Sequence, residues 1–421
     1  MKFGINTLDD VDVEGKTVLC RVDINQPVDR ASGTLKDETR IAACTPTVKE
    51  LSSKGARLVL LAHQGSDIEY ENYYTTAPHA EVLSRLLGRE VTFIDDVCGP
   101  AARAAIRGLQ NGEILLLDNV RFVAEEQTLF ETKLKLSHED QAKTLLVRKL
   151  APLADLYVCD AFAAAHRDQP SLCGFEQILP SAMGRLFEEE YGVISSLMEN
   201  PARPCVFVLG GSKINDAFLM METVLKSGAA DRVLSGGLVA QVLLWASGLD
   251  IGEASRALIK KKGYDNLVGA GEKLLTSYRE KISVPFDAAC VTDGRRIEYA
   301  AGRVPAGGVI MDIGTGTAEK YRELILAAKT VFVNGPPGVF EEAPAEKGTS
   351  LVWEALGDTV GYTVMGGGDS IAAAKKFKKT EKINYICTGG GALIRFLTGE
   401  ELPVVKALKR GSKIKQKSDK N

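Results

Sequence analysis

The chain has 421 residues, of which 45% are hydrophobic and 25% are charged, and its net charge is −3. This length predicts about two domains, each large enough to bury its own core. The small net charge excludes a general attraction to nucleic acid, so any anion site must be a local cluster of positive charge. No run of 18 apolar residues and no signal-peptide core occur, so we expect no membrane partner and a cytoplasmic location.

Short apolar runs alternate with helical patterns in the first part of the chain. Buried-strand patterns occur at residues 17–23, 57–62, 91–95, 113–120 and 155–161. Between the first two runs, the positions at helical spacing are Ile41, Thr45, Val48 and Leu51. Gly55 then ends this helical pattern. The alternation predicts βαβ units, and therefore a parallel sheet covered by helices.

The same alternation resumes in the second part of the chain, with strand patterns at residues 204–211, 231–237, 309–314, 330–338, 362–369 and 384–391. Between the two series lies a segment of helical periodicity that ends at Asn200-Pro201. We therefore predict an α/β fold with two Rossmann-like domains, each a parallel sheet covered by helices, joined by a central helix and hinge. The predicted boundaries are 1–178 for the first domain, 179–201 for the connecting helix and 202–401 for the second domain.

Glycine-rich turns follow the strand patterns of the second half. In an open α/β sheet, ligands bind at the carboxyl ends of the strands. These turns therefore predict a nucleotide site, with Lys213 for phosphate charge, Glu341 for ribose hydroxyls and Asp369 for a metal. The other residues that these turns supply are Gly210, Gly211, Gly236, Gly237, Asn334, Pro336, Pro337 and Gly338.

The turn "TVMGGGDS" combines three glycines, a carboxylate and the start of a helix. Glycines expose backbone N–H groups, and a helix start favours an anion such as phosphate. Asp369 would repel a bare phosphate, so its presence predicts Mg²⁺ between the two. Ser370 is expected to cap the helix. The structural alternative is a tight turn with a cap, although a second triple-glycine turn at Gly389 to Gly391 makes a ligand site the better interpretation.

Two other nucleotide motifs are absent or incomplete. No GxxxxGK[ST] sequence occurs, so the protein has no P-loop. The segment "DIGTGTAE" resembles a dinucleotide fingerprint, but Glu319 stands in place of its third glycine. An NAD-dependent oxidoreductase is therefore one alternative reading of the chain.

Polar and basic side chains end the strand patterns of the first half. They are Asp23, Asn25, His63, Arg121, His166 and Arg167. Arg40 stands at a helix start, where a cation opposes the helix dipole unless an anion is near. Each arginine alone could be a solvated or ion-paired surface residue. Together they predict a pocket for a small phosphorylated acid, with Asp23 and Asn25 binding a hydroxyl.

A nucleotide on one domain and a small acid on the other predict phosphoryl transfer, with domain closure that excludes water. No general base stands out, but a carboxylate nucleophile is already ionised at pH 7 and needs none. The eight cysteines include no CxxC and are expected to be reduced and buried. Of the four histidines, none pairs with cysteine or another histidine at zinc spacing.

The motifs in order along the chain are "RVDINQP", "DETRI", "AHQG", "DNVRF", "DAFAAAHR", "VLGGSK", "VNGPPGVFE", "GGGDS" and "TGGGA". On these motifs the chain resembles the phosphoglycerate kinase family, particularly its archaeal members, from about Gly15 to Leu408. The resemblance implies reversible phosphoryl transfer between ATP and the carboxylate of 3-phosphoglycerate, with Mg²⁺. It also implies a monomer, and a C-terminal segment (402–415) that packs back on the first domain.

The resemblance also assigns residues to the two ligands. Those implied to bind phosphoglycerate are Asp23, Ile24, Asn25, Arg40, His63, Gln64, Gly65, Ser66, Arg121 and Arg167. Those implied to bind the nucleotide are Lys213, Gly236, Gly237, Asn334, Pro336, Glu341, Gly366, Gly367, Gly368, Asp369 and Ser370. Arg40 and Lys213 are implied to be catalytic, and Asp369 to hold the metal.

Two positions depart from the pattern of many family members. Ser66 stands where those members have a substrate-binding arginine, and Ala217 stands where they have a second lysine near the transferred phosphate. Two alternatives follow: a kinase of a related phosphorylated acid, and a nucleotide-binding protein without catalysis.

Overall fold

The computed structural model describes residues 1–29, 31–65 and 73–416. The chain divides into two compact units, an N-terminal unit of Met1–Val193 with Glu401–Asn421, and a C-terminal unit of Ile194–Glu400. Each unit contains a parallel six-stranded sheet, which confirms the predicted α/β fold class.

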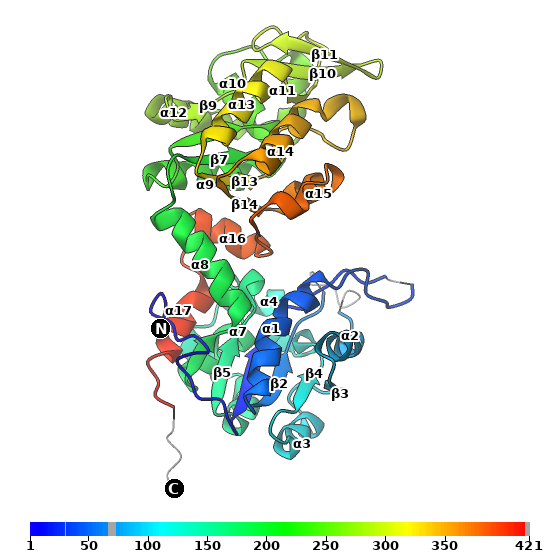
Figure 1. The fold of residues 1–421 in the computed structure, drawn as a ribbon, viewed down its shortest axis with the longest axis vertical. Helices are drawn as coiled ribbons and strands as arrows, with labels where there is room; N and C mark the ends of the chain where they lie inside the picture. Colours follow the sequence, from blue (N-terminus) through cyan, green and yellow to red (C-terminus); the bar gives the residue numbers. More distant parts are fainter. Residues whose placement is uncertain (30, 66–72, 417–421) are drawn as a thin grey trace. The chain divides into compact units, whose positions relative to one another are not determined.

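The sheet of the N-terminal unit has the strand order β3-β4-β2-β1-β5-β6 (Figure 1). Its strands are β1 (Thr17–Arg21), β2 (Arg57–Leu61), β3 (Thr92–Ile94), β4 (Ile114–Leu117), β5 (Leu156–Cys159) and β6 (Ser181–Met183). The helices of this unit are α1 (Thr39–Ser53), α2 (Ala77–Leu87), α3 (Pro100–Gly108), α4 (Thr128–Leu134), α5 (His138–Gln141), α6 (Leu145–Leu150) and α7 (Pro170–Cys173). From β1 the chain adds β2, β3 and β4 on one side of that strand, and it then adds β5 and β6 on the other side. The loops that follow these parallel strands therefore lie together at the carboxyl edge of the sheet.

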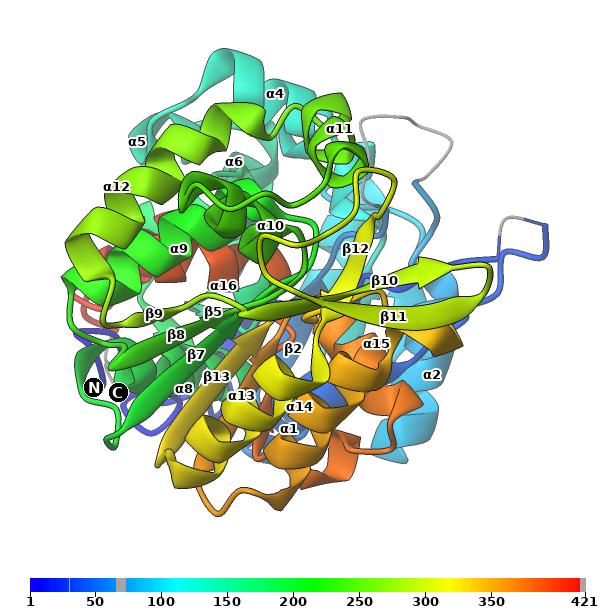
Figure 2. The same ribbon diagram turned by 90° about the horizontal axis from the view of Figure 1, so that it is seen from above.

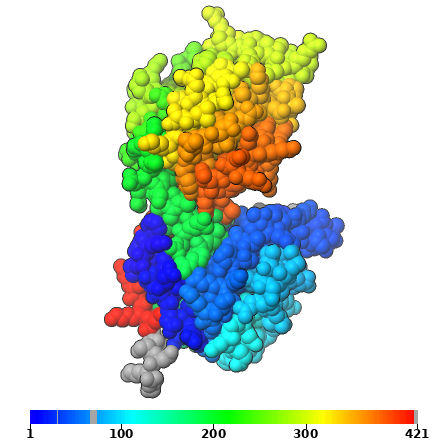
Figure 3. Space-filling model, viewed as in Figure 1, coloured from blue at the N-terminus to red at the C-terminus, as the bar shows by residue number. Residues whose placement is uncertain are grey.

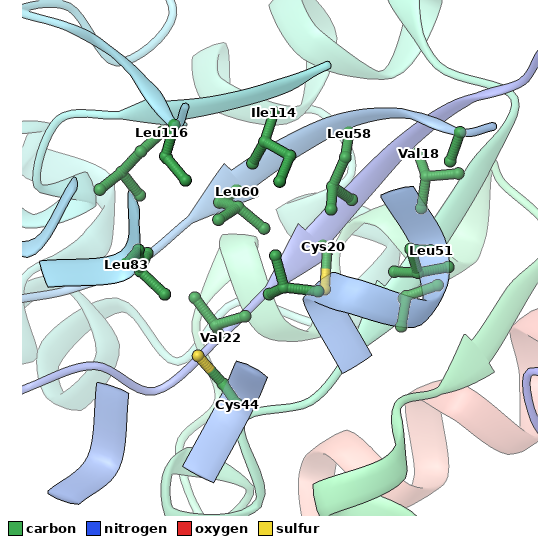
Figure 4. Close-up of a cluster of buried hydrophobic side chains, with 14 of the residues drawn as sticks. Val18, Cys20, Val22, Cys44, Leu51, Leu58, Leu60, Leu83, Ile114 and Leu116 are labelled. Carbon is green, nitrogen blue, oxygen red and sulfur yellow. The ribbon is translucent and has the colours of Figure 1, made fainter. Parts of the chain in front are cut away.

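One face of this sheet forms a core with α1 and α2. Figure 4 shows Val18, Cys20, Leu58 and Leu60 of the sheet packed against buried residues of these helices. The buried side of α1 includes Ile41, Cys44, Val48 and Leu51. Thr45, which was expected on this side, is only partly buried, because Cys44 lies nearer the centre of the helical stripe. Fully burying one such leucine contributes about 1.5–3 kcal/mol.

The sheet of the C-terminal unit has the order β15-β14-β13-β7-β8-β9. Its strands are β7 (Cys205–Leu209), β8 (Arg232–Ser235), β9 (Ile282–Ser283), β13 (Thr330–Asn334), β14 (Tyr362–Gly366) and β15 (Tyr385–Ile386). On one face lie α13 (Thr315–Ala327), α14 (Lys347–Asp358) and α15 (Gly368–Lys376) (Figure 2). On the other lie α9 (Ile214–Lys226), α10 (Gly237–Ala246), α12 (Val268–Tyr278) and α16 (Gly390–Leu397). A further helix, α11 (Glu253–Lys261), packs against α10.

One predicted strand lies elsewhere. The run at 309–314 was read as part of the parallel series, but β12 (Ile310–Ile313) belongs to a separate antiparallel sheet with β10 (Asp287–Thr292) and β11 (Arg295–Ala300). The strands β10 and β11 form a hairpin through Asp293 and Gly294, which both have positive φ. An Asp-Gly pair is typical of such tight turns. One edge of β10 is not paired with β11, and β12 pairs with that edge.

The two ends of the chain meet in the N-terminal unit. Helix α17 (Pro403–Gly411) packs against α7 and β6. Figures 1 and 3 show it in red beside the dark blue N-terminal segment. The backbone N–H of Asn6 donates to Ser412 Oγ at 2.8 Å, and the Asn6 amide donates to Ser181 O at 3.2 Å. Helix α8 (Arg185–Glu199) contains the point at which the two units divide.

Two general expectations can be checked across the chain. All eight cysteines are free and buried, as predicted for reduced thiols. Among the described residues, no helix is both long enough and apolar enough to cross a bilayer.

Candidate active site

Four arginines surround one buried histidine at the carboxyl edge of the N-terminal sheet. His63 follows β2, and the charges of Arg21, Arg121, Arg167 and Arg40 all act on it. Burial first, and then these charges, hold the pKa of His63 well below its usual range, so the imidazole is neutral. We call His63, Arg121 and Arg167 the anion pocket. The structure therefore brings together side chains that the sequence placed at separate strand ends.

Arg21 fixes which nitrogen of His63 carries the proton. Its Nη2 lies 3.1 Å from His63 Nδ1. Arginine has no acceptor, so Nδ1 must accept and the proton resides on Nε2. Arg21 is itself held by Ser171 Oγ, which accepts from its Nε at 3.0 Å, and Ser171 is held by the buried Glu126. This buried chain leaves the Nε2–H of His63 as a donor to a ligand.

Arg121 is the least satisfied cation of the anion pocket. It is 1% exposed, its Nη1 donates to Gly65 O, and its guanidinium lies 5.7 Å from the centre of the Tyr73 ring. Its Nε has no hydrogen-bond partner within the described part of the chain. Burial and the neighbouring Arg167 lower the pKa of Arg121 to about 10. A buried cation with an unused donor is costly unless an anion reaches it.

Arg40 and Asp23 already bind each other. Arg40 Nη1 donates to Asp23 Oδ2 at 2.9 Å, and Asp23 is 4% exposed. The other carboxylate oxygen of Asp23 accepts from Asn25 N at 3.1 Å, and Asn25 Oδ1 accepts from Gly65 N at 2.9 Å. This arrangement satisfies Arg40 in the first turn of α1, where the helix dipole disfavours it.

The remaining residues predicted to bind the acid differ in their hydrogen-bond partners and in their burial. Arg167 donates to Thr128 Oγ1 at 3.3 Å and lies 3.5 Å from a carboxylate oxygen of Glu131. The amide of Gln64 binds Gln26 and His79: its Oε1 accepts from Gln26 N at 3.0 Å and lies 2.9 Å from His79 Nε2, and its Nε2 donates to Gln26 O at 2.8 Å. Ile24 is buried. Ser66 lies outside the described residues.

Sequence reasoning missed Arg21, Ser171 and Glu126. Arg21 opens the motif "RVDINQP" but lies inside an apolar strand pattern, and no quoted motif contains Ser171 or Glu126. Their role follows only from the contacts that link them to His63.

The glycine-rich turns of the C-terminal unit also share one edge. They follow β7, β8, β13 and β14, which are neighbours in the parallel sheet. The chain changes direction between β7 and β13, and this switch point is where open α/β sheets bind ligands. Lys213, after β7, is exposed at the start of α9, and Glu341, after β13, is also exposed. Ala217 lies on the buried face of α9.

Several glycines are required by the packing of one loop against another. A Cβ on Gly335 would lie 2.2 Å from Gly210 O, and one on Gly237 would lie 2.7 Å from Gly211 N. Gly236 is equally constrained, because a Cβ there would lie 2.4 Å from Pro337 Cα. The sequence could not distinguish this packing from the approach of a ligand, because both require the absence of a side chain.

The three glycines of the turn at 366–368 differ in how much space a Cβ atom would have. Gly367 has φ of 85°, and a Cβ there would lie 2.3 Å from Asn334 Oδ1. A Cβ on Gly366 would lie 2.2 Å from Leu393 Cδ2, whereas one on Gly368 would meet nothing within 4 Å. Only the first two positions therefore require glycine for the fold.

Ser370 does not cap α15, which corrects the expectation. The residue at the cap position is Gly367, and Ser370 is buried inside the first turn. Its Oγ accepts from Gly335 N at 2.7 Å and so ties the turn after β13 to α15. Asp369 remains exposed in the same turn. An exposed carboxylate beside the unpaired N–H groups of a helix start fits a phosphate-bound Mg²⁺.

A narrow pocket adjoins these loops. It is mostly apolar, and its walls include Gly237, Leu244, Pro285, Ile310 and Pro337. Gly237 and Pro337 belong to the predicted turns, whereas Leu244, Pro285 and Ile310 come from elements that no motif connects to them.

The partial dinucleotide fingerprint is not a phosphate site. Gly316 N and Thr317 N, at the start of α13, both donate to the carboxylate of Asp287 at 2.9 Å. A carboxylate therefore occupies the position that a pyrophosphate would take, and the oxidoreductase interpretation is wrong.

Two α/β units, one with an arginine-lined anion pocket and one with glycine loops at a sheet switch point, define a two-domain phosphotransferase. Comparison with known proteins identifies the family. The family model for phosphoglycerate kinase matches residues 8–400, so the chain belongs to this family. The predicted family and the prediction of an enzyme are confirmed.

Relatives match along nearly the whole chain. The phosphoglycerate kinase of Methanothermobacter thermautotrophicus is 45% identical over 408 residues, covering 97% of each chain. That of Methanothermus fervidus is 45% identical over 418 residues, covering 99% of each chain. The crystal structure of the Pyrococcus horikoshii phosphoglycerate kinase matches with a TM-score of 0.84 at 41% identity, covering 97% of this chain and 99% of that one.

Proposed function

We propose that the protein transfers a phosphoryl group reversibly between ATP and the carboxylate of 3-phosphoglycerate, forming 1,3-bisphosphoglycerate and ADP in glycolysis and gluconeogenesis. The observation that carries this proposal is the buried guanidinium of Arg121 beside Arg167 and the Nε2–H of His63. These donors suit a phosphate dianion, which accepts several charge-assisted hydrogen bonds at once.

The N-terminal unit binds the acid in one orientation. The anion pocket holds the phosphate that the acid already carries. Asp23 and Asn25 bind its hydroxyl, and Arg40 then faces the reacting carboxylate. Since Arg40 bonds to Asp23 in this structure at 2.9 Å, ligand binding exchanges one negative partner for another.

The C-terminal unit binds the nucleotide. Lys213 and the starts of α9 and α15 face the phosphates, and Glu341 binds the ribose. Asn334, Pro336, Gly236 and the turn from Gly366 to Ser370 form the walls. Asp369 would hold Mg²⁺, which neutralises charge on the transferred phosphoryl group.

Transfer requires the two bound substrates to meet, and domain closure about residues 179–201 remains the predicted means. The nucleophile is an ionised carboxylate, so Arg40, Lys213 and the metal contribute by positioning and charge neutralisation rather than by proton transfer. We also propose a monomeric enzyme in the cytoplasm, where eight free thiols stay reduced.

One assay tests the proposal against its alternatives. ADP formation is measured with MgATP and 3-phosphoglycerate, 2-phosphoglycerate or glycerate. We expect turnover with 3-phosphoglycerate to exceed the others by at least roughly 10², because the anion pocket and Asp23 fix both ends of one acid. Faster turnover with another acid would establish a related kinase. MgATP binding without acyl phosphate formation would establish a non-catalytic protein.

A further inference from the structure

A second group of ligand-type side chains lies in the N-terminal unit. His138 Nε2, a carboxylate oxygen of Asp168 and Cys173 Sγ all lie within 4.8 Å of one another. His138 begins α5, Cys173 ends α7, and Asp168 lies just before α7. The sequence showed no histidine and cysteine at zinc spacing, because these residues are distant in the chain and the packing of α5 against α7 joins them.

The three donor types select a class of metal. Imidazole nitrogen, carboxylate oxygen and thiolate sulfur are the usual ligands of Zn²⁺, whereas Mg²⁺ and Ca²⁺ prefer oxygen alone. Tetrahedral Zn²⁺ with bonds of about 2.0–2.3 Å separates neighbouring ligand atoms by roughly 3.3–3.6 Å. His138 Nε2 and Asp168 Oδ1 are 3.2 Å apart, so this pair already has nearly the required separation. Since the sulfur lies within 4.8 Å of the other two atoms, it needs a shift of up to roughly 1.5 Å to reach this separation.

A buried amide beside the cluster is incompletely satisfied. Gln141 is 1% exposed and lies one turn after His138 in α5. Its Nε2 donates to Asp168 Oδ1 at 2.5 Å, but its Oε1 has no hydrogen-bond partner within the described ranges. Turning the amide exchanges its oxygen and nitrogen, which would direct Oε1 toward a cation held by Asp168. The turn would give up the bonds that Nε2 donates to Leu136 O and to Asp168 O, both at 3.3 Å, so the bound cation must replace them. Without such a cation, two oxygens would repel each other there.

We propose that His138, Asp168 and Cys173 bind one Zn²⁺ ion, with Gln141 Oε1 or a water molecule as the fourth ligand. The side chains of His138 and Asp168 are 15% and 43% exposed, so an ion can enter from the solvent side, while Cys173 closes the site from within. This site is separate from the Mg²⁺ position at Asp369, which offers a carboxylate alone.

The metal would act on the anion pocket through a short path. Asp168 N donates to Glu131 Oε1 at 2.8 Å, and the other oxygen of Glu131 lies 3.5 Å from Arg167. In the metal-free protein Cys173 Sγ–H donates to Arg167 O at 3.8 Å, and this bond is lost when the thiol releases its proton to solvent and binds the metal as a thiolate. Binding therefore changes the contacts of the segment that carries Arg167. This consequence rests on the proposed function and predicts a changed KM for phosphoglycerate with little change in kcat.

The test uses the reduced, metal-free full-length protein and Co²⁺ as a spectroscopic substitute for Zn²⁺. We expect one Co²⁺ per chain, a thiolate-to-metal charge-transfer band, and displacement of Co²⁺ by one equivalent of Zn²⁺. His138→Gln and Cys173→Ser should each weaken Zn²⁺ binding by more than roughly 100-fold, since even residues that only support metal ligands contribute 10–100-fold. Cys98→Ser, at a buried cysteine of the same unit outside the cluster, is the matched control.

The proposal is overturned if the wild-type protein shows no thiolate band, or if His138→Gln binds Zn²⁺ as tightly as the wild type. The partly exposed His138 variant decides the matter even if Cys173→Ser fails to fold. The kinase assay without Zn²⁺ is independent of these results. Loss of metal binding with intact turnover would refute this site alone, and metal binding without turnover would refute the proposed function alone.

Discussion

Arg40 differs from the anion-pocket arginines in exposure and in partner. Its side chain is 37% exposed and pairs with Asp23, whereas Arg121 is 1% exposed and has an unused donor. This contrast is consistent with Arg40 facing the reacting carboxylate of the acid and Arg121 binding the phosphate that the acid already carries. Loss of an interaction that strengthens only in the transition state lowers turnover, whereas loss of uniform binding raises KM.

Arg40→Ala should therefore reduce kcat by at least roughly 10³ and change the KM for phosphoglycerate little. Arg121→Ala should mainly raise that KM. Steady-state kinetics of both variants with varied 3-phosphoglycerate test this assignment. If Arg40→Ala mainly raises KM while Arg121→Ala mainly lowers kcat, the acid binds in the opposite orientation.

Asp369 is the carboxylate proposed to bind Mg²⁺, and it is exposed in the first turn of α15. Asp369→Ala should lower kcat on the order of 10²–10³ and raise the Mg²⁺ concentration needed for half-maximal rate. Asp369→Asn, which keeps the shape but not the charge, should behave almost as poorly. The check is the rate of each variant across an Mg²⁺ titration. If Asp369→Ala keeps wild-type turnover at low Mg²⁺, Asp369 is not a metal ligand and only provides a favourable negative charge at the start of α15.

The sequence predicted which charged residues gather, but not which residues orient them. Asp23, His63 and Arg121 could be found because polar residues at strand ends are unusual. Arg21 and Glu126 could not, because a buried polar residue is recognised only when its partners are known. His138, Asp168 and Cys173 escaped for the same reason, since their proximity depends on how α5 packs against α7.

At the scale of elements, the parallel strands were predictable because a strand buried on both faces appears as an apolar run. The placement of β12 was not, because an apolar run does not specify which strand it pairs with. Glycine turns present the same limit, since Gly335 serves loop packing and Gly368 has open space around it.

The turn between β14 and α15 allows a paired test of this distinction. Gly367→Ala places a Cβ 2.3 Å from Asn334 Oδ1 at a φ of 85°. Positive φ alone costs about 1–2 kcal/mol for a residue with a Cβ, and the clash adds to it. Gly368→Ala, where nothing lies within 4 Å, should change stability by no more than about 0.5 kcal/mol.

Urea unfolding and the KM for MgATP measure these two effects. We expect Gly367→Ala to lower the unfolding midpoint and to weaken nucleotide binding, because Asn334 must move. Gly368→Ala should keep the wild-type midpoint, and any rise in its KM would then report a ligand close to that backbone. Equal midpoints for both variants would contradict the turn geometry described above.

At the scale of the whole molecule, both units bury carboxyl groups that accept backbone hydrogen bonds. Glu126 accepts from Ser171 N, and Asp160 accepts from Leu186 N and Phe187 N. In the C-terminal unit, Asp312 accepts from Gly348 N. Burial raises the pKa of Glu126 and of Asp160 to about 7, and that of Asp312 to about 6.

These raised pKa values predict a loss of stability as pH rises. Below its ordinary pKa of 4.5, Glu126 is protonated in both the folded and the unfolded chain, and its ionisation affects neither. As pH rises toward 7, the unfolded chain releases the proton while the folded chain retains it, so the free energy of unfolding falls. Above pH 7 both forms are ionised, and the cost becomes constant. At about 1.36 kcal/mol per pKa unit, the cost for Glu126 reaches roughly 3 kcal/mol.

Glu126→Gln removes this titration and keeps an acceptor for Ser171 N, while its Nε2 replaces the oxygen that accepts from Ser171 Oγ. Between pH 4.5 and pH 8, the free energy of unfolding of the variant should therefore rise relative to the wild type by up to about 3 kcal/mol. Urea unfolding of both proteins at several pH values, followed by a signal from the N-terminal unit, provides the measurement. Glu81→Gln, at an exposed glutamate of the same unit, should instead follow the wild-type profile within about 0.5 kcal/mol.

Parallel profiles for Glu126→Gln and wild type would mean that Glu126 is ionised in the folded protein across this range, as a carboxylate that balances Arg21 and Arg121. In that case the negative charge of Glu126 would lower the net positive charge around the anion pocket by one. The electrostatic attraction of the pocket for a phosphate dianion would then be weaker.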